Sequence, residues 1–401
     1  MLLNMRSRRL SWPEVGKLGT WGRSRALLAI LLFVLAVRPL VWPRTSVSEL
    51  FKTVVPRLPP PTSVLHPNTP RQAPLNAGVV FSIETNTTSF TESTEYFPQY
   101  GKSEPGQRYR IENSRLIEEA GRSSGGDSLL LMTVFNDEES WGANRSVADF
   151  FQLVGSFDYP KAKTSIAMLT SSMDEFTKVK AFYGRFIHDY AQLSVIFRND
   201  FSQEGLTRAN RHADSVQANR RRMLSRYRNY ALLSTLQTWQ QHVVWLDADI
   251  NVIPSGLVRE MIQSGRDIVE PMCVRMHHAD SNKTDDWYDY DLNAWVGQRK
   301  VRPAALRDGD FVPGPLRVKH MWDLRSKKDT FTPLDSVGGT MLYVRADVHR
   351  QGVLFPAHYL IGGEWTSEGY DGIETEGLCY TAHFLGFKCW AMPHDLIYHA
   401  T

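Results

Sequence analysis

The sequence predicts an α/β domain with a doubly wound sheet, because short apolar runs alternate along it with longer stretches of helical periodicity. The apolar runs have the length of buried strands and comprise Leu129–Val134, Thr164–Leu169, Leu193–Phe197 and Val243–Leu246. The helical patterns between them comprise Arg145–Val154, Glu175–Tyr190 and Asp214–Gln240. Apolar strands separated by helices are typical of parallel βαβ units covered on both faces. Ligands of such sheets bind at the carboxyl ends of the strands, so the site is expected there.

The amino terminus has the pattern of a membrane anchor. Six Lys and Arg residues and one acidic residue, Glu14, precede twelve apolar residues, Ala26–Val37. Arg38 and Pro39 interrupt this stretch before Leu40–Trp42, and a complete membrane span needs roughly 17–25 residues. A cleaved signal peptide is the alternative, but it needs a small-residue cleavage site that this stretch does not offer. The charge pattern predicts a cytosolic tail at 1–25, a signal anchor at 26–42 and a lumenal remainder, the type II topology.

The segment after the anchor is predicted to be a stem. Residues 43–106 contain ten of the chain's 21 prolines, are rich in Ser and Thr, and lack a sustained apolar period. A segment of this composition cannot bury a core. Residues 107–401 are then expected to form the globular, lumenal domain. The net charge of +3 is spread along the chain without a basic tail, so no nucleic-acid partner is expected.

Three cysteines leave two interpretations open. An oxidising lumen permits one disulfide, and Cys379–Cys389 is the pair close in sequence. Three buried free thiols, including Cys273, are the alternative. The N-glycosylation sequons Asn86-Thr-Thr, Asn144-Arg-Ser and Asn282-Lys-Thr agree with a lumenal location.

Two carboxylates stand at the carboxyl end of the last apolar run. Asp247 and Asp249 follow Val243–Leu246, with one small residue between them. Carboxylates at the end of a buried strand have to be solvated, capped or metal-bound, because an unpaired buried charge is costly. Hard cations such as Mg²⁺ and Mn²⁺ take oxygen ligands and bridge to phosphate oxygens. The pair therefore indicates a metal site for a diphosphate leaving group, with a capping or turn role as the alternative.

The bare D-x-D pattern is weak evidence by itself. Asp289-Tyr-Asp291 and Asp308-Gly-Asp310 also match it in this chain. Neither of these follows an apolar strand, so we expect both in loops.

Further motifs give the chain a family resemblance. They are Arg228-Asn229-Tyr-Ala-Leu-Leu-Ser-Thr-Leu, Val-Trp-Leu-Asp247-Ala-Asp249-Ile, Tyr290-Asp291-Leu-Asn293-Ala-Trp295, Leu334-Asp335-Ser-Val-Gly338-Gly339-Thr340, Val344-Arg345-Ala-Asp347-Val-His349-Arg350-Gln-Gly352 and Gly372-Ile-Glu374-Thr-Glu376-Gly377. With them, the chain resembles the fungal mannosyltransferase family of the Golgi mannan polymerase subunits Mnn9, Van1 and Anp1. The motifs span nearly all of residues 128–401 in the expected order, whereas the first 105 residues match only in kind, as anchor plus stalk.

The resemblance implies a GT-A type glycosyltransferase domain, a Rossmann-like nucleotide-sugar fold with a mixed sheet. It further implies transfer of mannose from GDP-mannose to the α-1,6-linked mannan backbone of N-glycans, with retention at the anomeric carbon and a requirement for Mn²⁺. Family members are expected in the Golgi membrane, as hetero-oligomers with related mannosyltransferase subunits. Composition and spacing by themselves indicate neither mannose, nor guanine, nor retention.

The same resemblance assigns the metal ligands. Asp247 and Asp249 would bind the metal and the donor, and His399 would be the third protein ligand. A solvent-facing terminal histidine is the alternative for His399, and His394 is the neighbour most easily mistaken for it.

Basic and polar residues near the first and last strands are candidates for donor binding. Arg220, Arg221 and Arg222 begin the helix ahead of the last strand, and helical spacing places Arg220 on its apolar face. An inward arginine needs an anion, which a diphosphate supplies, so Arg220 is a candidate for donor binding and catalysis. Arg221 and Arg228 are donor-binding candidates too, and a solvated basic patch is the alternative. Residues after the first strand, expected near base and ribose or in an ordinary turn, are Thr133, Asn136 and Asp137.

Two acidic residues near the carboxyl terminus are candidates for the chemistry. Glu374 and Glu376 precede an amphipathic helix, Leu378–Leu385, where acidic residues also serve as helix caps. One of them would act as a base on the acceptor hydroxyl or stabilise the anomeric carbon, and we prefer Glu376.

The acceptor side is assigned to residues farther along the chain. Asp291, Asn293 and Trp295 combine an aromatic ring with polar groups, although Trp295 suits the core equally well. Gly338-Gly339 predicts either a close backbone approach at the start of a strand or a tight turn.

Two other functions compete with a metal-dependent mannosyltransferase. A non-catalytic structural subunit of a mannan polymerase would hold a complex together, but the chain keeps Asp247, Asp249 and His399. A metal-dependent phosphohydrolase would need further clustered His and Asp ligands for a second metal, and the sequence offers no such cluster.

Overall fold

The computed structural model describes residues 82–86, 89–122, 127–202, 206–207, 209–210, 213–277, 286–299 and 315–400. All of them belong to one compact unit, Pro74–Thr401. The predicted cytosolic tail, the anchor at 26–42 and the stem up to residue 81 lie outside the described residues. Among the helices that are described, none is both long and apolar enough to cross a bilayer.

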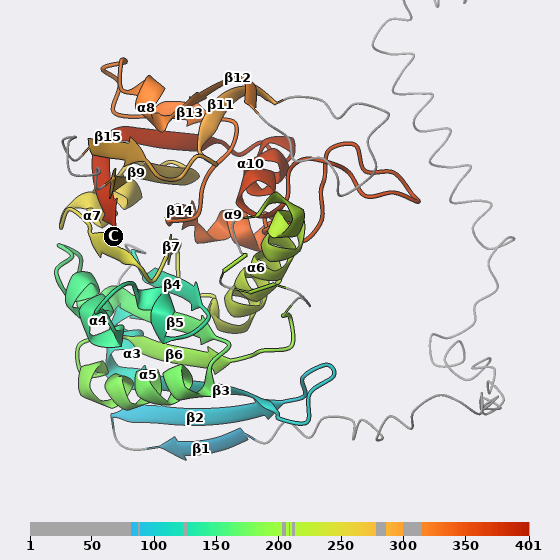
Figure 1. Cartoon of the computed structure of the whole chain (residues 1–401). Helices are drawn as coiled ribbons and strands as arrows, with labels where there is room; N and C mark the ends of the chain where they lie inside the picture. The colour runs from blue at the N-terminus through green and yellow to red at the C-terminus, as the bar shows by residue number, and fades with distance from the viewer. Residues whose placement is uncertain are drawn as a thin grey trace, which may run out of the picture. The chain divides into compact units, whose positions relative to one another are not determined.

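A mixed sheet forms the centre of this unit (Figure 1). Within the described residues it has 13 strands, in the order β1-β2-β3-β6-β5-β4-β7-β14-β9-β15-β13, with β10 paired to β9 and β8 to β15. The strands of the amino-terminal half are β1 Ser82–Asn86, β2 Phe90–Phe97, β3 Gly106–Asn113, β4 Leu129–Phe135, β5 Thr164–Thr170, β6 Gln192–Phe197 and β7 His242–Leu246. Those of the carboxyl-terminal half are β8 Ile250–Val252, β9 Ile268–His277, β10 Asp286–Asp289, β13 Thr332–Leu334, β14 Met341–Arg345 and β15 Cys389–His399. A separate hairpin pairs β11 Trp295–Arg299 with β12 Pro315–His320.

The parallel part of the sheet confirms the predicted βαβ units. β4 pairs in parallel with both β5 and β7, and β5 pairs in parallel with β6. Successive side chains of β4 point to opposite faces. Leu129 and Leu131 therefore pack under α4 Val147–Gly155 and α5 Met173–Phe186, whereas Leu130 and Met132 pack under α6 Asp214–Thr235. Burial on both faces explains why these strands are continuous apolar runs.

Local sequence explains where two of these helices start. Ser146 caps α4 in a capping box with Asp149, and the Ser172 hydroxyl accepts a hydrogen bond from the amide of Glu175 at the start of α5. The remaining helices are α3 Ser114–Arg122, η1 Glu138–Trp141, η2 Lys161–Lys163, α7 Leu257–Gln263, α8 Met321–Leu324, α9 Ala346–Arg350 and α10 Glu374–Phe384.

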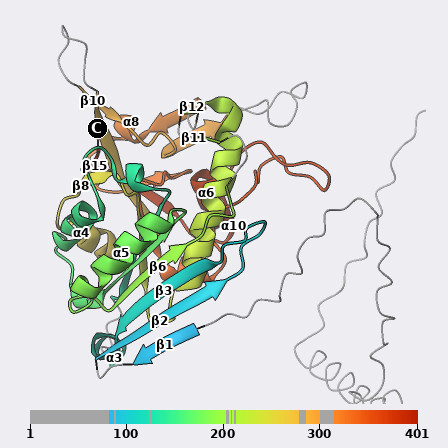
Figure 2. The same ribbon diagram turned by 60° about the horizontal axis from the view of Figure 1, so that its bottom comes forward.

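The globular domain begins earlier than the sequence indicates. Strands β1 and β2 lie in the segment assigned to the stem, and the boundary expected at residue 107 falls inside β3. β3 pairs antiparallel with β6, and Figure 2 shows β2 and β1 continuing the sheet beyond it. Only one of the eight residues of β2 is buried, so this strand lacks the apolar run that reveals a central strand.

The carboxyl-terminal half makes the sheet mixed rather than parallel. β14 pairs antiparallel with both β7 and β9, whereas β15 runs parallel to β9. A disulfide between Cys379 and Cys389 joins α10 to the start of β15, which settles the open question about these cysteines. Cys273 is a buried free thiol on β9.

Candidate functional site

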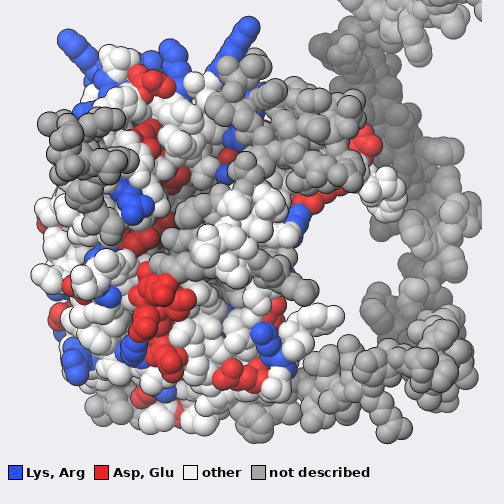
Figure 3. All heavy atoms as spheres, in the orientation of Figure 1, with Lys and Arg blue, Asp and Glu red and all other residues white. Residues whose placement is uncertain are grey.

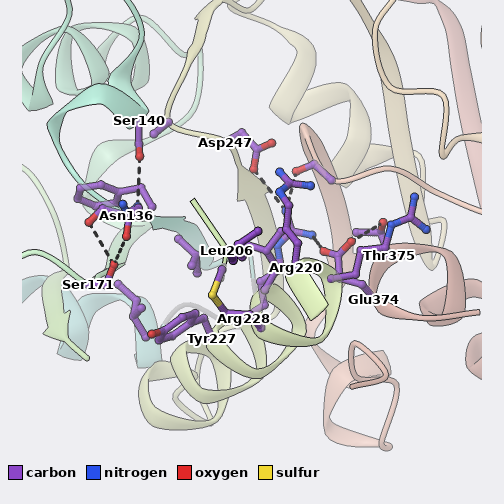
Figure 4. Close-up of a pocket in the computed structure, with 18 of the residues that line it drawn as sticks. Asn136, Ser140, Ser171, Leu206, Arg220, Tyr227, Arg228, Asp247, Glu374 and Thr375 are labelled. Atoms are coloured by element: carbon purple, nitrogen blue, oxygen red, sulfur yellow. Dashed lines mark hydrogen bonds and ion pairs between the residues drawn. The ribbon is translucent and has the colours of Figure 1, made fainter. Parts of the chain in front are cut away.

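A cavity of about 770 Å³ opens at the carboxyl ends of β4 and β7. α6 forms one wall, and the turn before β14 and the start of α10 form another. Polar neutral side chains lie at one end of the cavity and charged ones at the other, as Figure 4 shows. Figure 3 shows that acidic side chains gather in the middle of the face on which the carboxyl terminus lies.

Asp247 enters the cavity directly from the buried strand β7. Its amide donates to the carbonyl of Thr340 at 2.9 Å, and its Oδ1 accepts from Nη2 of Arg228 at 3.3 Å. Although 37% of the side chain is open to the cavity, enclosure by protein raises the pKa of Asp247 to about 7. Arg228 opposes this rise in pKa, whereas the nearby carboxylates of Asp249 and Asp291 add to it.

Asp249 and His399 lie together, as the family resemblance implies. The Nε2 atom of His399 is 3.1 Å from Oδ2 of Asp249. The pairing of β8 with the end of β15 brings these distant residues together, and the amide of Ala400 donates to the carbonyl of Asp249 at 2.8 Å. His394, also on β15, is exposed and contacts the carbonyl of Lys327 at 2.7 Å instead.

The predicted metal site is therefore present only in part. Nowhere in the described parts of the chain do three or more His, Cys, Asp or Glu residues cluster closely enough to hold a metal ion. Asp249 and His399 supply a carboxylate and an imidazole, which Mn²⁺ accepts as ligands. Asp247, the remaining predicted ligand, faces Arg228. The carboxylate of Asp249 and the imidazole of His399 would supply part of the ligand set of such a cation.

The arginines of α6 meet protein carboxylates. Arg228 is buried, and its guanidinium forms an ion pair with Glu374 as well as contacting Asp247. Arg221 lies 3.0 Å from Oε2 of Glu376 and donates to Oδ1 of Asn293 at 3.2 Å. The third member of the predicted run, Arg222, binds both oxygens of Glu368, at 2.9 and 2.7 Å. Arg220 and Arg221 both line the cavity, and Figure 4 shows Arg220 there.

The two candidate glutamates point in different directions. They begin α10, where residues two apart face nearly opposite sides of a helix. Glu374 lines the cavity, and its φ of 59° places it in the left-handed region that side-chain-bearing residues rarely adopt. Glu376 is buried between Arg221 and Arg299, with Nη1 of Arg299 donating to its Oε1 at 2.9 Å. The geometry favours Glu374 over the preferred Glu376 for contact with a ligand.

The glycine pair before β14 confirms the predicted close approach. A Cβ atom on Gly338 would lie 2.0 Å from Oδ2 of Asp291, and one on Gly339 would lie 2.6 Å from Nη2 of Arg228. Asp291 accepts hydrogen bonds from the amides of Gly339 and Thr340, at 2.7 and 3.1 Å. What approaches this backbone is therefore the protein's own side chains, which hold the turn that supports Asp247.

The predicted acceptor residues divide into two groups. Asp291 and Asn293 line the cavity, although Asp291 uses its carboxylate to hold the glycine turn. Trp295 is 3% exposed and does not line the cavity, in agreement with its alternative as a core residue.

Tyr290 lines the cavity with its ring centroid 4.0 Å from that of His399. Asp289 ends β10 rather than lying in a loop, and Asp308-Gly-Asp310 lies outside the described residues.

The neutral end of the cavity contains one of the three residues predicted after β4. Asn136 lines it, and its Oδ1 atom accepts a hydrogen bond from the Ser171 hydroxyl (Figure 4). Asp137 instead caps η1, where its side chain accepts from the amide of Glu139. Thr133 is buried and does not line the cavity.

Sequence reasoning missed several residues of the cavity wall. These are Ser140, Ser171, Tyr227 and Tyr290. Position could have revealed Ser171, because it directly follows β5 at the edge of the sheet where β4 and β7 also end.

Comparisons with known proteins agree with the resemblance. The chain is 28% identical over 261 residues to the mannan polymerase complex subunit mnn9 of Schizosaccharomyces pombe, covering 60% of this chain and 73% of that relative. It is 28% identical over 273 residues to the mannan polymerase I complex VAN1 subunit of Saccharomyces cerevisiae, covering 64% of this chain and about half of that relative (49%).

A solved structure is also similar. The mannosyltransferase PcManGT from Pyrobaculum calidifontis, in complex with GDP-Man and Mn2+, gives a TM-score of 0.38 at 12% identity, covering 72% of this chain and 65% of that one. The family model described as Anp1 matches residues 108–359, more than half of the chain. The chain therefore belongs to the Anp1 family.

Proposed function

We propose that this chain is a metal-dependent mannosyltransferase. It transfers mannose from GDP-mannose to the α-1,6-linked mannan backbone of N-glycans, with retention at the anomeric carbon. The relatives' names support mannan as the product, because they are mannan polymerase subunits. GDP-mannose, the linkage and retention are the finer points implied by the family resemblance.

One observation carries the proposal. Asp247, Asp249, Arg228 and Glu374 line one end of a single cavity, and His399 contacts Asp249 there, so that five separate elements or their ends meet at this point. Buried ion pairs are costly to build, and structural stability alone is a weak reason to gather them around an open cavity. A GT-A type site needs such a charged end for the diphosphate and the reacting sugar.

Asp249 and His399 would hold Mn²⁺, with Asp247 beside them. The ion would neutralise charge on the diphosphate as it leaves. This neutralisation would be needed because the carboxylates of Asp247 and Asp249 alone would repel a diphosphate.

The chain's own residues bind and orient the two substrates in this proposal. Arg220 faces the phosphates, and Arg228 fixes the carboxylates of Asp247 and Glu374 relative to each other. Glu374 faces the sugar that is transferred. The neutral end at Asn136 and Ser171 receives the base and ribose, whose polar edges need hydrogen-bond partners rather than charges.

The cellular setting is part of the proposal. A type II Golgi anchor would place the domain in the lumen, and the disulfide Cys379–Cys389 supports an oxidising compartment. Partnership with related subunits in a hetero-oligomer follows from the relatives' names as complex subunits.

A non-catalytic subunit is the second candidate function. The observation that favours it is that Glu376, Arg221, Arg222 and Arg228 are already neutralised by one another and by neighbours. A site whose charges are satisfied internally needs no ligand to be stable.

Sugar transfer by the full chain tests the proposal. The purified protein in detergent would receive GDP-mannose, Mn²⁺ and α-1,6-mannobiose, with trisaccharide measured by mass spectrometry and its linkage by NMR. We expect product from the parent protein, none from Asp249→Asn, and parental yield from His394→Ala, a matched change on β15 outside the cavity. Tight Mn²⁺-dependent GDP-mannose binding without product, even with partner subunits added, would instead support the structural subunit.

A further inference from the structure

Tyr288, Tyr290 and Leu292 form a row of alternate residues at the end of β10 and just after it. Tyr288 is 41% exposed and Leu292 is 56% exposed, and between them Tyr290 lines the cavity. The carboxylates at the intervening positions are engaged in hydrogen bonds, although Asp291 also lines the cavity. Asp291 is 8% exposed and bound to the glycine turn, and Asp289 accepts from the amide of Trp322 at 3.2 Å.

The row starts at the candidate metal pair. The ring of Tyr290 packs on His399, with 4.0 Å between centroids, and His399 pairs with Asp249. The ring of Tyr288 follows, its centroid 6.5 Å from that of Tyr290. Two aromatic rings therefore form a continuous surface from the charged end of the cavity out along β10.

Polar groups accompany the two rings. Arg275 is the register partner of Tyr288 on β9, and its guanidinium carbon lies 5.6 Å from the centroid of Tyr290. Both tyrosines carry hydroxyl groups. Aromatic faces beside hydrogen-bond donors match a sugar, whose C–H face packs on a ring while its hydroxyls bond to polar neighbours.

We infer that Tyr288 and Tyr290, with Leu292 and Arg275, bind successive hexose units of the saccharide acceptor. The inference rests on the proposed function, because it takes the end at Asp249 and His399 as the point of transfer. Two rings in line suit consecutive sugars of a chain better than a single nucleobase. The neutral end at Asn136 and Ser171 offers the polar partners that a base requires.

Replacing Tyr288, the ring farther from His399, tests the inference without changing the candidate metal ligands Asp249 and His399. The full chain would be compared as parent, Tyr288→Ala, Tyr288→Phe and Trp287→Ala. Trp287 is the matched control, because it is the adjacent residue of β10 and packs on Tyr398 with centroids 5.0 Å apart. Binding of α-1,6-mannotetraose without donor would be followed by saturation-transfer NMR, and KM would be measured for the tetraose and for GDP-mannose.

Loss of the ring should weaken saccharide binding specifically. We expect Tyr288→Ala to raise the KM for mannotetraose by roughly 2- to 10-fold and to reduce saturation transfer, with the KM for GDP-mannose unchanged. Tyr288→Phe should retain most of the binding, and Trp287→Ala should match the parent. Equal tetraose binding by Tyr288→Ala and parent, or a change confined to the KM for GDP-mannose, would overturn the inference.

Failure of the proposed function gives a different pattern. Tetraose binding that depends on Tyr288, without transfer to product, would contradict catalysis while leaving the saccharide surface intact. No saturation transfer from the parent protein to mannotetraose would overturn the inference of a saccharide-binding surface, whether or not GDP-mannose binds.

Discussion

The two ends of the cavity are built in different ways. At the neutral end, Asn136 and Ser171 are 35 residues apart, follow neighbouring parallel strands and join through one hydrogen bond between neutral side chains. At the charged end, Arg228 pairs with Glu374 across 146 residues, and Asp249 meets His399 only because β8 pairs with β15. The residues of the neutral end are thus brought together by two neighbouring strands, whereas those of the charged end are brought together by segments distant in the sequence and by buried ion pairs. A defect at the charged end should therefore affect folding and chemistry together, and one at the neutral end should affect only binding.

The largest effect is expected from removing Arg228. Arg228→Met leaves Glu374 and Asp247 without their shared cation in a buried setting, which should lower the free energy of unfolding by about 3–5 kcal/mol. Arg222→Met, on the same helix, breaks an ion pair whose side chains are 28% and 33% exposed, and should cost about 0–1 kcal/mol. Urea denaturation followed by circular dichroism compares the two. Equal losses would contradict the distinction between buried and surface pairs.

A smaller effect is expected at the glycine turn that supports Asp247. Gly338→Ala places a methyl group 2.0 Å from the Asp291 carboxylate, and the required shift should cost about 1–3 kcal/mol of stability. Gly184→Ala is the control, because a Cβ there meets nothing within 4 Å and Ala favours the interior of α5 by about 0.5–1 kcal/mol. Thermal unfolding should therefore shift in opposite directions, and a neutral Gly338→Ala would show that the turn is loosely held.

The smallest effect is expected at the neutral end. Ser171→Ala removes the hydroxyl that bonds Asn136, a contribution of about 0.5–1.5 kcal/mol. The KM for the donor should rise by roughly tenfold at most, with kcat unchanged, because the lost contact is the same in ground and transition states. Steady-state kinetics at saturating acceptor measures both constants. A fall in kcat with constant KM would place the chemistry near Ser171 instead.

The sequence predicted the parallel half of the sheet well. β4, β5, β6 and β7 are buried on both faces, so their apolar runs are visible without any tertiary information. β2 could not be found in this way, because only one of its eight residues is buried and it therefore has no apolar run. The mixed direction of β14 also depends on tertiary pairing.

Site residues were predictable where position along a strand decides their role. Asp247 and Asp249 follow a buried strand, and their place at its end is inherent in the sequence. The preference for Glu376 in the chemistry stays a prediction, but of the two glutamates only Glu374 lines the cavity, which depends on how α10 is rotated about its axis. Likewise, the sequence could not reveal the ion pair of the donor-binding candidate Arg221, because its partner Glu376 is remote in the sequence.

Mn²⁺-dependent binding of GDP-mannose tests the central claim most directly, namely that the charged end is a metal and donor site. Isothermal titration calorimetry with the full chain would compare the parent, His399→Ala and His394→Ala, with and without Mn²⁺. We expect parental affinity for His394→Ala, whose exposed side chain contacts the carbonyl of Lys327. His399→Ala should lose about 10- to 100-fold in Mn²⁺-dependent affinity and fall to the level seen with chelator. Equal affinities of all three proteins for GDP-mannose, or an affinity that is the same with and without Mn²⁺, would contradict the claim.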